Sequence, residues 1–185
     1  MGADIIRGVF FGSDGEVADM KTYNLWSIVC SFIIIALVCG FTGISCAQRE
    51  GANIGDKAPD FTLQDLSGAN IKLSEVVKDN KAALLVFWAT WCPYCVNEIP
   101  QLKQLNAAYG NKGLKILAID IGEGNKKVES FAKKEGIDYT ILLDPNNGVA
   151  NQYGVTGIPT NILIDNNGVI KHKGVHPPPE NLLPK

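Results

Sequence analysis

The chain has 185 residues, of which 46% are hydrophobic and 19% are charged, and its formal net charge is −2. This length fits one globular domain preceded by a leader. The first 45 residues contain four acidic and two basic side chains, so they account for the whole net charge. A neutral remainder has no electrostatic reason to bind nucleic acid, and we expect no such partner.

An uncharged segment lies between Lys21 and Arg49, and it is almost wholly apolar over residues 25–38. About 20 apolar residues span a bilayer, so the segment predicts either a membrane anchor or the core of a signal peptide. A buried helix of the folded domain is the third interpretation. Both export interpretations place the domain on the outer, periplasmic side of the cytoplasmic membrane, where disulfides persist.

The acidic residues at the start of the chain are unlike the positively charged start of a signal peptide, whereas Met20 and Lys21 fit one. The stretch after the apolar segment is polar and contains glycine, as a tether does. We therefore expect four regions: a non-native or untranslated extension (1–19), a signal peptide, lipoprotein signal or membrane anchor (20–46), a tether (47–57) and the folded domain (58–185).

Cys46 closes the leader and follows small residues. The sequence Gly43-Ile44-Ser45-Cys46 resembles a bacterial lipoprotein box, in which the cysteine is lipidated. That box prefers leucine where this chain has Gly43, so lipidation of Cys46 and a chance cysteine are both open. Cys30 and Cys39 lie in the apolar segment and fit small apolar fillers.

The first part of the domain predicts a hairpin and a buried strand. Alternating residues 61–66 predict a strand, Ser67-Gly68-Ala69-Asn70 a turn, and residues 71–73 the returning strand. Ser74 fits the N-cap of a short helix that runs to Val77. Residues 81–88 form a continuous apolar run, which is typical of a central strand buried on both faces.

Helices and strands alternate over the rest of the chain. A helix is expected from Pro93 to about Tyr109 with Gly110 as its stop, and another over 128–135 ended by Gly136. Strands are expected at 114–119, 139–143, 160–165 and 169–173, the last two joined as a hairpin, and a short helical turn at 147–153. This alternation predicts an α/β fold, a mixed sheet with helices on both faces.

The segment Trp91-Cys92-Pro93-Tyr94-Cys95 lies between the buried strand and the next predicted helix. Two cysteines separated by two residues at a helix start can close a small disulfide ring, and the helix amides and dipole lower the pKa of the first thiol. The order of strand, loop and helix therefore indicates a thiol–disulfide redox site. Zinc would need about four ligands; there is no second CxxC, and His172 and His176 are the chain's two histidines, far along the sequence from the motif. We therefore expect no metal and no cofactor.

Four motifs occur together: Gly55-Asp56-Lys57-Ala58-Pro59-Asp60-Phe61, Phe87-Trp88-Ala89-Thr90-Trp91-Cys92-Pro93-Tyr94-Cys95, Glu98-Ile99-Pro100 and Gly157-Ile158-Pro159-Thr160. They resemble the TlpA/ResA branch of the thioredoxin superfamily, a relative of the AhpC/TSA redoxins, over residues 54–175. The resemblance implies a thioredoxin-like fold with an N-terminal β-hairpin and a central insertion at 121–155. The residues after 176 depart from the family's closing helix, so we expect one face of the sheet to be less covered.

The resemblance implies a role for each cysteine of the motif. Cys92 would be the more exposed sulfur, attack the disulfide of a partner protein and form the mixed disulfide. Cys95 lies further into the helix and would resolve that intermediate by attacking Cys92.

Glu98 follows Cys95 by three residues, so both lie on one helix face. A carboxylate there could take and return the Cys95 proton during exchange, and the family has a glutamate at this offset. Plain thioredoxin instead carries a buried acid six residues before the first cysteine, where this chain has Val86. The alternative for Glu98 is an ordinary surface glutamate.

The resemblance also implies a groove that binds the partner. Pro159 resembles the cis-proline that faces the disulfide in this superfamily and presents the backbone of Ile158 to the partner. Trp91, Pro93 and Tyr94 complete the expected groove beside the cysteines.

The sequence thus predicts an extracytoplasmic thiol–disulfide oxidoreductase, membrane-tethered through its N-terminal segment or a lipoprotein, that reduces disulfides of partner proteins. Apocytochrome c is one substrate of the family; the electron donor would be a membrane protein and the enzyme a monomer. A thiol peroxidase, a disulfide oxidase or isomerase, and a redox-silent binding module stay open. Peroxidases of the related kind place threonine three residues before the cysteine, whereas Thr90 stands two before Cys92.

Overall fold

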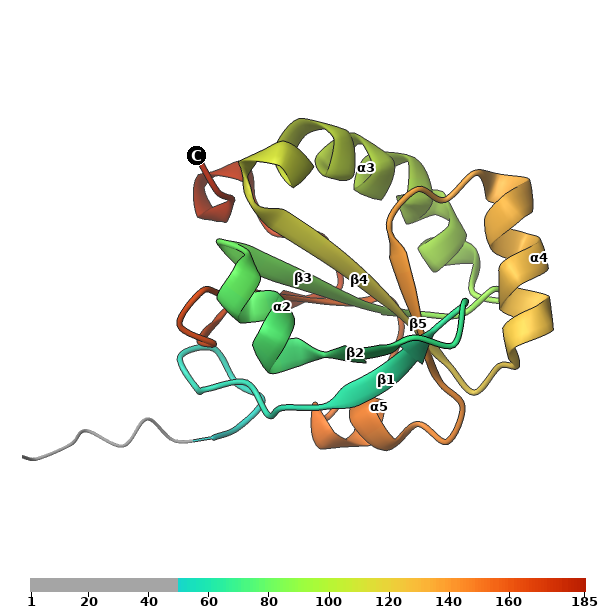
Figure 1. Cartoon of the computed structure of the whole chain (residues 1–185), viewed down its shortest axis with the longest axis horizontal. Coiled ribbons are helices and arrows are strands. Elements are labelled where there is room, and N and C mark those ends of the chain that lie inside the picture. Colours follow the sequence, from blue (N-terminus) through green and yellow to red (C-terminus); the bar gives the residue numbers. More distant parts are fainter. Residues whose placement is uncertain (1–49) are drawn as a thin grey trace, which may run out of the picture. The chain divides into compact units, whose positions relative to one another are not determined.

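The structure, a computed structural model, describes residues 50–185, which form a seven-stranded sheet with helices packed around it (Figure 1). Within these residues no helix has the length and apolar character needed to cross a bilayer. The predicted leader, with its apolar segment at 25–38 and Cys46, lies outside the described residues.

The elements follow the predicted order. The strands are β1 (Thr62–Asp65), β2 (Asn70–Lys72), β3 (Ala82–Trp88), β4 (Leu114–Ile121), β5 (Thr140–Asp144), β6 (Thr160–Asp165) and β7 (Ile170–Gly174). The helices are α2 (Leu73–Asp79), α3 (Pro93–Tyr109), α4 (Asn125–Glu135) and α5 (Gly148–Gln152), with 3-10 turns η1 (Gly110–Lys112) and η2 (Glu180–Leu182). The predicted strands and helices of the domain are all present, with boundaries that differ by at most three residues.

The sheet has the strand order β2-β1-β5-β4-β3-β6-β7. The strands β3, β4 and β5 run parallel, β6 pairs antiparallel with β3, and the hairpins β1–β2 and β6–β7 form the two edges. The predicted mixed α/β sheet is therefore confirmed. All seven residues of β3 are buried at its centre, as their continuous apolar run predicts.

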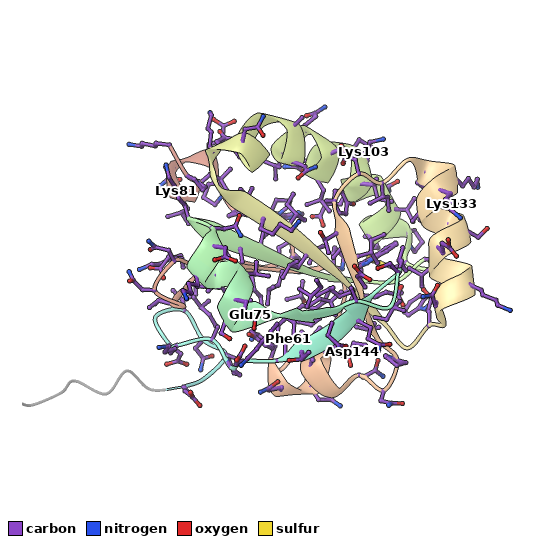
Figure 2. The ribbon with its side chains drawn as sticks, in the orientation of Figure 1. Phe61, Glu75, Lys81, Lys103, Lys133 and Asp144 are labelled. Carbon is purple, nitrogen blue, oxygen red and sulfur yellow. A yellow bond between two sulfur atoms is a disulfide. The ribbon has the colours of Figure 1, made fainter. Side chains whose placement is uncertain are left out.

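Different helices cover the two faces of the sheet. On one face Leu85 and Phe87 of β3 pack in a cluster with residues of α2 and α5. On the other face Val86 and Trp88 pack in clusters with residues of α3 and α4. Successive strand residues point to opposite faces, so β3 contributes to both layers. Figure 2 shows the side chains crowded between the sheet and these helices.

The C-terminal segment covers the sheet without a regular helix. Leu183, which follows η2, is 4% exposed and packs in the same cluster as Leu84 and Leu102. The ammonium group of Lys81 donates to the backbone oxygen of Lys185 at 3.1 Å. The C-terminal segment thus contributes one buried leucine to this face in place of the family's closing helix.

One predicted helix end is wrong, and the other is confirmed in position but not in the conformation of its glycine. The residue at the N-cap of α2 is Lys72, not Ser74, and it forms no side-chain cap. Instead the carboxylate of Asp60 accepts the backbone N–H of Ser74 at 2.9 Å. At the far end of α3, Gly110 keeps a right-handed conformation and continues into η1, and the chain reverses at Gly113, where φ is 99°.

The first described residues pack along the domain. The backbone N–H of Ala58 donates to the carbonyl of Gly168 at 2.8 Å, and the ammonium group of Lys173 donates to the carbonyl of Ala52 at 2.9 Å. These contacts fix residues 50–58 to β7 and to the β6–β7 turn, the end of the sheet where β3 begins.

Candidate active site

The two cysteines of the motif lie where the central strand ends and α3 begins. After three loop residues that follow Trp88, Cys92 occupies the N-cap of α3, and Pro93 is the first helical residue. Cys92 and Cys95 are joined by a disulfide, so the predicted ring is present. Proline fits the first helical position because that residue needs no N–H donor there and has the φ angle that proline imposes.

The helix start supplies a hydrogen-bond donor to the first sulfur. The backbone N–H of Cys95 donates to Sγ of Cys92 at 3.2 Å. This N–H belongs to the first turn of α3, where the helix dipole is positive. After reduction, the same donor and dipole would stabilise a thiolate on Cys92.

The two cysteines of the disulfide are buried, whereas the neighbouring aromatic side chains are exposed to solvent. Cys92 and Cys95 are each 3% exposed, so the expectation that Cys92 is the more exposed is wrong for the oxidised state. The carbonyl oxygen of Ile158 lies 3.7 Å from Sγ of Cys92 and contributes to this cover. Trp91 and Tyr94 are 62% and 77% exposed, so a partner meets aromatic surface before it meets sulfur.

A groove of about 500 Å³ opens beside the disulfide. Its lining residues are Tyr94, Asn97, Glu98, Gln101, Ile158, Pro159, Val175 and His176. The structure therefore brings together the predicted residues Tyr94, Ile158 and Pro159, whereas Trp91 and Pro93 do not line the groove. The peptide bond between Ile158 and Pro159 is cis, as predicted.

A second cavity of similar volume, about 520 Å³, lies between α2 and the β6–β7 turn. Lys57, Ser74 and Gly168 are among its lining residues, and none of the predicted site residues is. It lies at the end of the sheet where β3 begins, whereas the disulfide follows the end of β3, so this cavity is not part of the candidate site.

Glu98 is a buried residue of α3, and its reading as a surface glutamate is wrong. It is 8% exposed, and the amide nitrogen of Asn161 donates to both of its carboxylate oxygens at 3.2 Å. Burial raises the pKa of Glu98, against the opposing effects of the Asn161 hydrogen bond and of His176 nearby. A buried carboxyl that borders an open groove can exchange protons with a thiol or with solvent.

Glu98 also lies close to the position where plain thioredoxin carries its buried acid. Val86 holds that position in β3 and pairs in register with Asn161 of β6. Residues that pair directly across two strands share a face of the sheet, so Asn161 holds Glu98 over the face to which Val86 points. The carboxyl reaches this region from α3 and not from β3.

Two further buried acids lie beside the motif and were not among the predicted site residues. Asp120 of β4 is fully buried, and Glu123 in the following loop is 8% exposed. Burial raises the pKa of Asp120 to about 8, helped by the adjacent Glu123 carboxyl. Against its own burial, contacts with Lys127 and Thr90 lower the pKa of Glu123. A single acid within the otherwise buried strand 114–121 is the sequence signal that could have identified Asp120.

The sequence and fold have close counterparts among known proteins. Residues 54–173 match the AhpC/TSA family. The thiol-disulfide oxidoreductase ResA of Geobacillus thermodenitrificans is 39% identical over 118 residues, which are 64% of this chain and 67% of that protein. The resemblance expected from the four motifs is confirmed.

Solved structures give the same result for the fold. A putative thiol:disulfide interchange protein DsbE from Chlorobium tepidum superposes with a TM-score of 0.63 at 34% identity, over 71% of this chain and 91% of that one. A secreted Mycobacterium tuberculosis disulfide oxidoreductase, homologous to E. coli DsbE, superposes with a TM-score of 0.55 at 29% identity, over 63% and 84% of the two chains. The expected thioredoxin-like fold is confirmed.

Proposed function

The chain belongs to the AhpC/TSA family and is a thiol–disulfide oxidoreductase, and from this premise we propose that it reduces disulfides of partner proteins outside the cytoplasmic membrane. The observation that carries the proposal is the Cys92–Cys95 disulfide at the start of α3, beside a groove that contains the cis Pro159. An open groove next to a covered disulfide suits a protein segment that lies along the groove and brings its own sulfur to Cys92.

The reaction passes through a mixed disulfide. In the reduced enzyme the Cys92 thiolate attacks one sulfur of the partner's disulfide, and the partner's other sulfur leaves as a thiolate. Cys95 then loses its proton and attacks Sγ of Cys92, which releases the partner's second sulfur and forms the Cys92–Cys95 disulfide. Two electrons pass to the partner, and the oxidised enzyme has the disulfide seen in the structure. A membrane protein returns two electrons and restores the dithiol.

Glu98 acts as the base for the second step and accepts the proton of Cys95. Two observations support this role. Glu98 follows Cys95 by three residues along α3, and its buried carboxylate accepts hydrogen bonds from Asn161 at both oxygens. The burial that raises its pKa makes the carboxylate a better proton acceptor than an exposed glutamate.

The proposed location rests on relatives and on the leader. The M. tuberculosis relative is described as secreted, and the apolar segment at 25–38 would carry this chain across the membrane or hold it there. In the lipoprotein alternative, Cys46 carries the lipid. Apocytochrome c is the substrate we propose first, because its paired cysteines must be reduced before haem is attached, and the enzyme acts as a monomer.

Trapping tests the two cysteine roles. The full chain with Cys95→Ser should accumulate mixed disulfides with partner proteins, because Cys92 still attacks and nothing resolves the intermediate. The matched control is Cys92→Ser, which keeps one thiol of the pair and should trap none. Non-reducing gels, followed by reduction and mass spectrometry, identify the partners. Trapping by Cys92→Ser alone would reverse the roles, and trapping by neither variant would contradict the function.

The reduction potential tests the direction of electron flow. We would equilibrate the full chain with thiol buffers and follow tryptophan fluorescence, since Trp88 and Trp91 both lie within four residues of Cys92. A value near about −270 mV, the thioredoxin range, would fit a reductant. A value near about −120 mV, the range of the periplasmic oxidant DsbA, would show that the enzyme makes disulfides instead.

A further inference from the structure

Asp120 is a buried acid whose polar neighbour is a second acid, Glu123. It pairs in register with Trp88, the last residue of β3, so the two side chains share the face covered by α3 and α4. Asp120 is fully buried, and neither carboxylate oxygen has a hydrogen-bond partner among residues 50–185. An ionised carboxylate in such a place is very unfavourable, so the side chain favours its protonated form.

The neighbouring strand shows how this fold normally buries an aspartate. Asp144 ends β5 and is 3% exposed (Figure 2). Its two oxygens accept the backbone N–H groups of Gly148 and Ala150, each at 2.8 Å. Asp144 therefore keeps backbone donors that replace water, whereas Asp120 on the adjacent strand forms no well-aligned hydrogen bond and faces the Glu123 carboxyl instead. A structural carboxylate does not account for Asp120.

Glu123 joins this buried acid to the loop that leads to Cys92. Its carboxylate accepts the backbone N–H of Thr90 at 2.6 Å and the Thr90 hydroxyl at 2.8 Å. It also forms an ion pair with Lys127 of α4. Thr90 precedes Cys92 by two residues, so the charge on Glu123 fixes the conformation of the segment that delivers the attacking sulfur.

We infer that Asp120 and Glu123 hold one proton between them and act together as positioning residues for Cys92. Asp120 carries the proton, and Glu123 carries the single negative charge that binds Thr90. The inference rests on the proposed role of Cys92 as the attacking thiol. The shared proton is not consumed in thiol–disulfide exchange, so the electron and atom balance of the reaction is unchanged.

The groups around Asp120 explain why a second negative charge would disturb the loop. They are Glu123 from the loop and Lys127 from α4, with the uncharged Trp88 and Leu143 paired in register on the flanking strands. Ionised Asp120 would repel both the Glu123 carboxylate and a Cys92 thiolate. Among the described residues, Lys127 is the cation that opposes this repulsion.

The test measures the reactivity of Cys92 against pH in the reduced full chain. Iodoacetamide labels the thiols, and mass spectrometry reports the rate at Cys92 separately from the other cysteines. Three variants are compared. Asp120→Asn imitates the neutral acid and Glu123→Gln removes the charge of Glu123. Thr90→Val removes the hydroxyl that donates to Glu123. Asp79→Asn, an exposed aspartate of α2, is the matched control.

We expect a distinct result from each variant. Asp120→Asn should match the wild type below about pH 8 and react about twofold or more faster above it, because the variant never gains the second charge. Glu123→Gln should slow Cys92 about tenfold at neutral pH, as loss of a charge-assisted hydrogen bond predicts. Thr90→Val together with Glu123→Gln should be no slower than Glu123→Gln alone.

A second measurement does not depend on how the variants fold. The ¹³C signal of the Asp120 carboxyl in the wild-type chain should titrate near pH 8 and not near its ordinary value of about 4. An ordinary titration, or an Asp120→Asn profile identical to that of the wild type, would overturn the inference. Failure of the proposed function looks different, since Cys92 would then trap no partner whatever Asp120 does.

Discussion

Two acidic sites flank the central strand, and they are built in opposite ways. On the β6 side, Glu98 has both oxygens held by Asn161 and borders an open groove. On the β4 side, Asp120 is sealed, forms no well-aligned hydrogen bond among the described residues and faces the Glu123 carboxyl. A partnered carboxyl beside a groove can gain and lose a proton as the reaction proceeds, whereas a sealed one keeps its protonation state and fixes the charge around it.

The largest expected effect comes from removing the ionisable group of the sealed site. The raised pKa of Asp120 means that the folded state keeps a proton the unfolded chain releases, so wild-type stability falls as pH rises from about 4 to about 8. Asp120→Asn lacks this loss and should be more stable by on the order of 5 kcal/mol at pH 8, and by little at pH 4. Denaturant melts at several pH values measure the difference, and a constant difference would contradict it.

The partnered aspartate on the next strand should respond with the opposite sign. Asp144→Ala leaves the backbone N–H groups of Gly148 and Ala150 without acceptors, which should destabilise the fold by about 2 kcal/mol. The control is Asp79→Ala on the exposed side of α2, where a change within about 0.5 kcal/mol is expected. Urea melts at pH 7 compare the two, and equal effects would mean that the contacts of Asp144 contribute nothing.

Asn161 tests what the hydrogen-bond partner does for the open site. Asn161→Ala removes the donor to both oxygens of Glu98, so the pKa of that carboxyl should rise further. The fold should lose about 1 kcal/mol through the lost hydrogen bonds. Titration of the Glu98 carboxyl by NMR gives the first result and thermal melts the second. A pKa that falls in the variant would show that burial is not the main cause of the shift.

The smallest effect on stability, and a clear effect on reactivity, should come from Glu98→Gln. Because burial raises the pKa of Glu98, the variant should gain stability relative to the wild type as pH rises above the ordinary glutamate value. The rate at which Cys95 resolves a mixed disulfide should fall and lose its dependence on the Glu98 titration. Stopped-flow reduction of a model disulfide checks this, with the exposed Glu75→Gln as control; an unchanged pH profile would remove Glu98 from the reaction.

The sequence could show Glu98 but not Asp120, and the reason is geometric. Glu98 stands three residues from Cys95 on one helix, so a local rule and the family resemblance both identify it. The position of Asp120 beside the redox loop depends on the pairing of β4 with β3, which joins residues 32 positions apart (Trp88 and Asp120). The same limit explains the wrong N-cap prediction for α2. The backbone N–H of Ser74 donates to Asp60, which lies 14 residues earlier, so local spacing could not identify this contact.

Elsewhere the sequence predicted elements better than it predicted surfaces. The continuous apolar run of β3 and the proline after Cys92 needed only local chemistry, and both are where the pattern indicated. The equal exposure of Cys92 and Cys95 could not be predicted from the sequence. The burial of Cys92 depends in part on the carbonyl of Ile158, which belongs to a loop far along the chain. The end of α3 at Gly110 was also predicted correctly, although Gly110 is right-handed, since glycine accepts a right-handed turn as readily as a left-handed one.

The attachment of residues 50–58 to the β6–β7 turn also sets how the enzyme meets its surroundings. β3 spans seven residues, so at about 3.3 Å per residue roughly 20 Å separates that attachment from the redox loop. If the N-terminal segment tethers the protein as proposed, a pull on the chain at residue 50 would act on an outer hairpin and not on the loop around Cys92. The tethered end and the reactive end would then lie at opposite ends of β3.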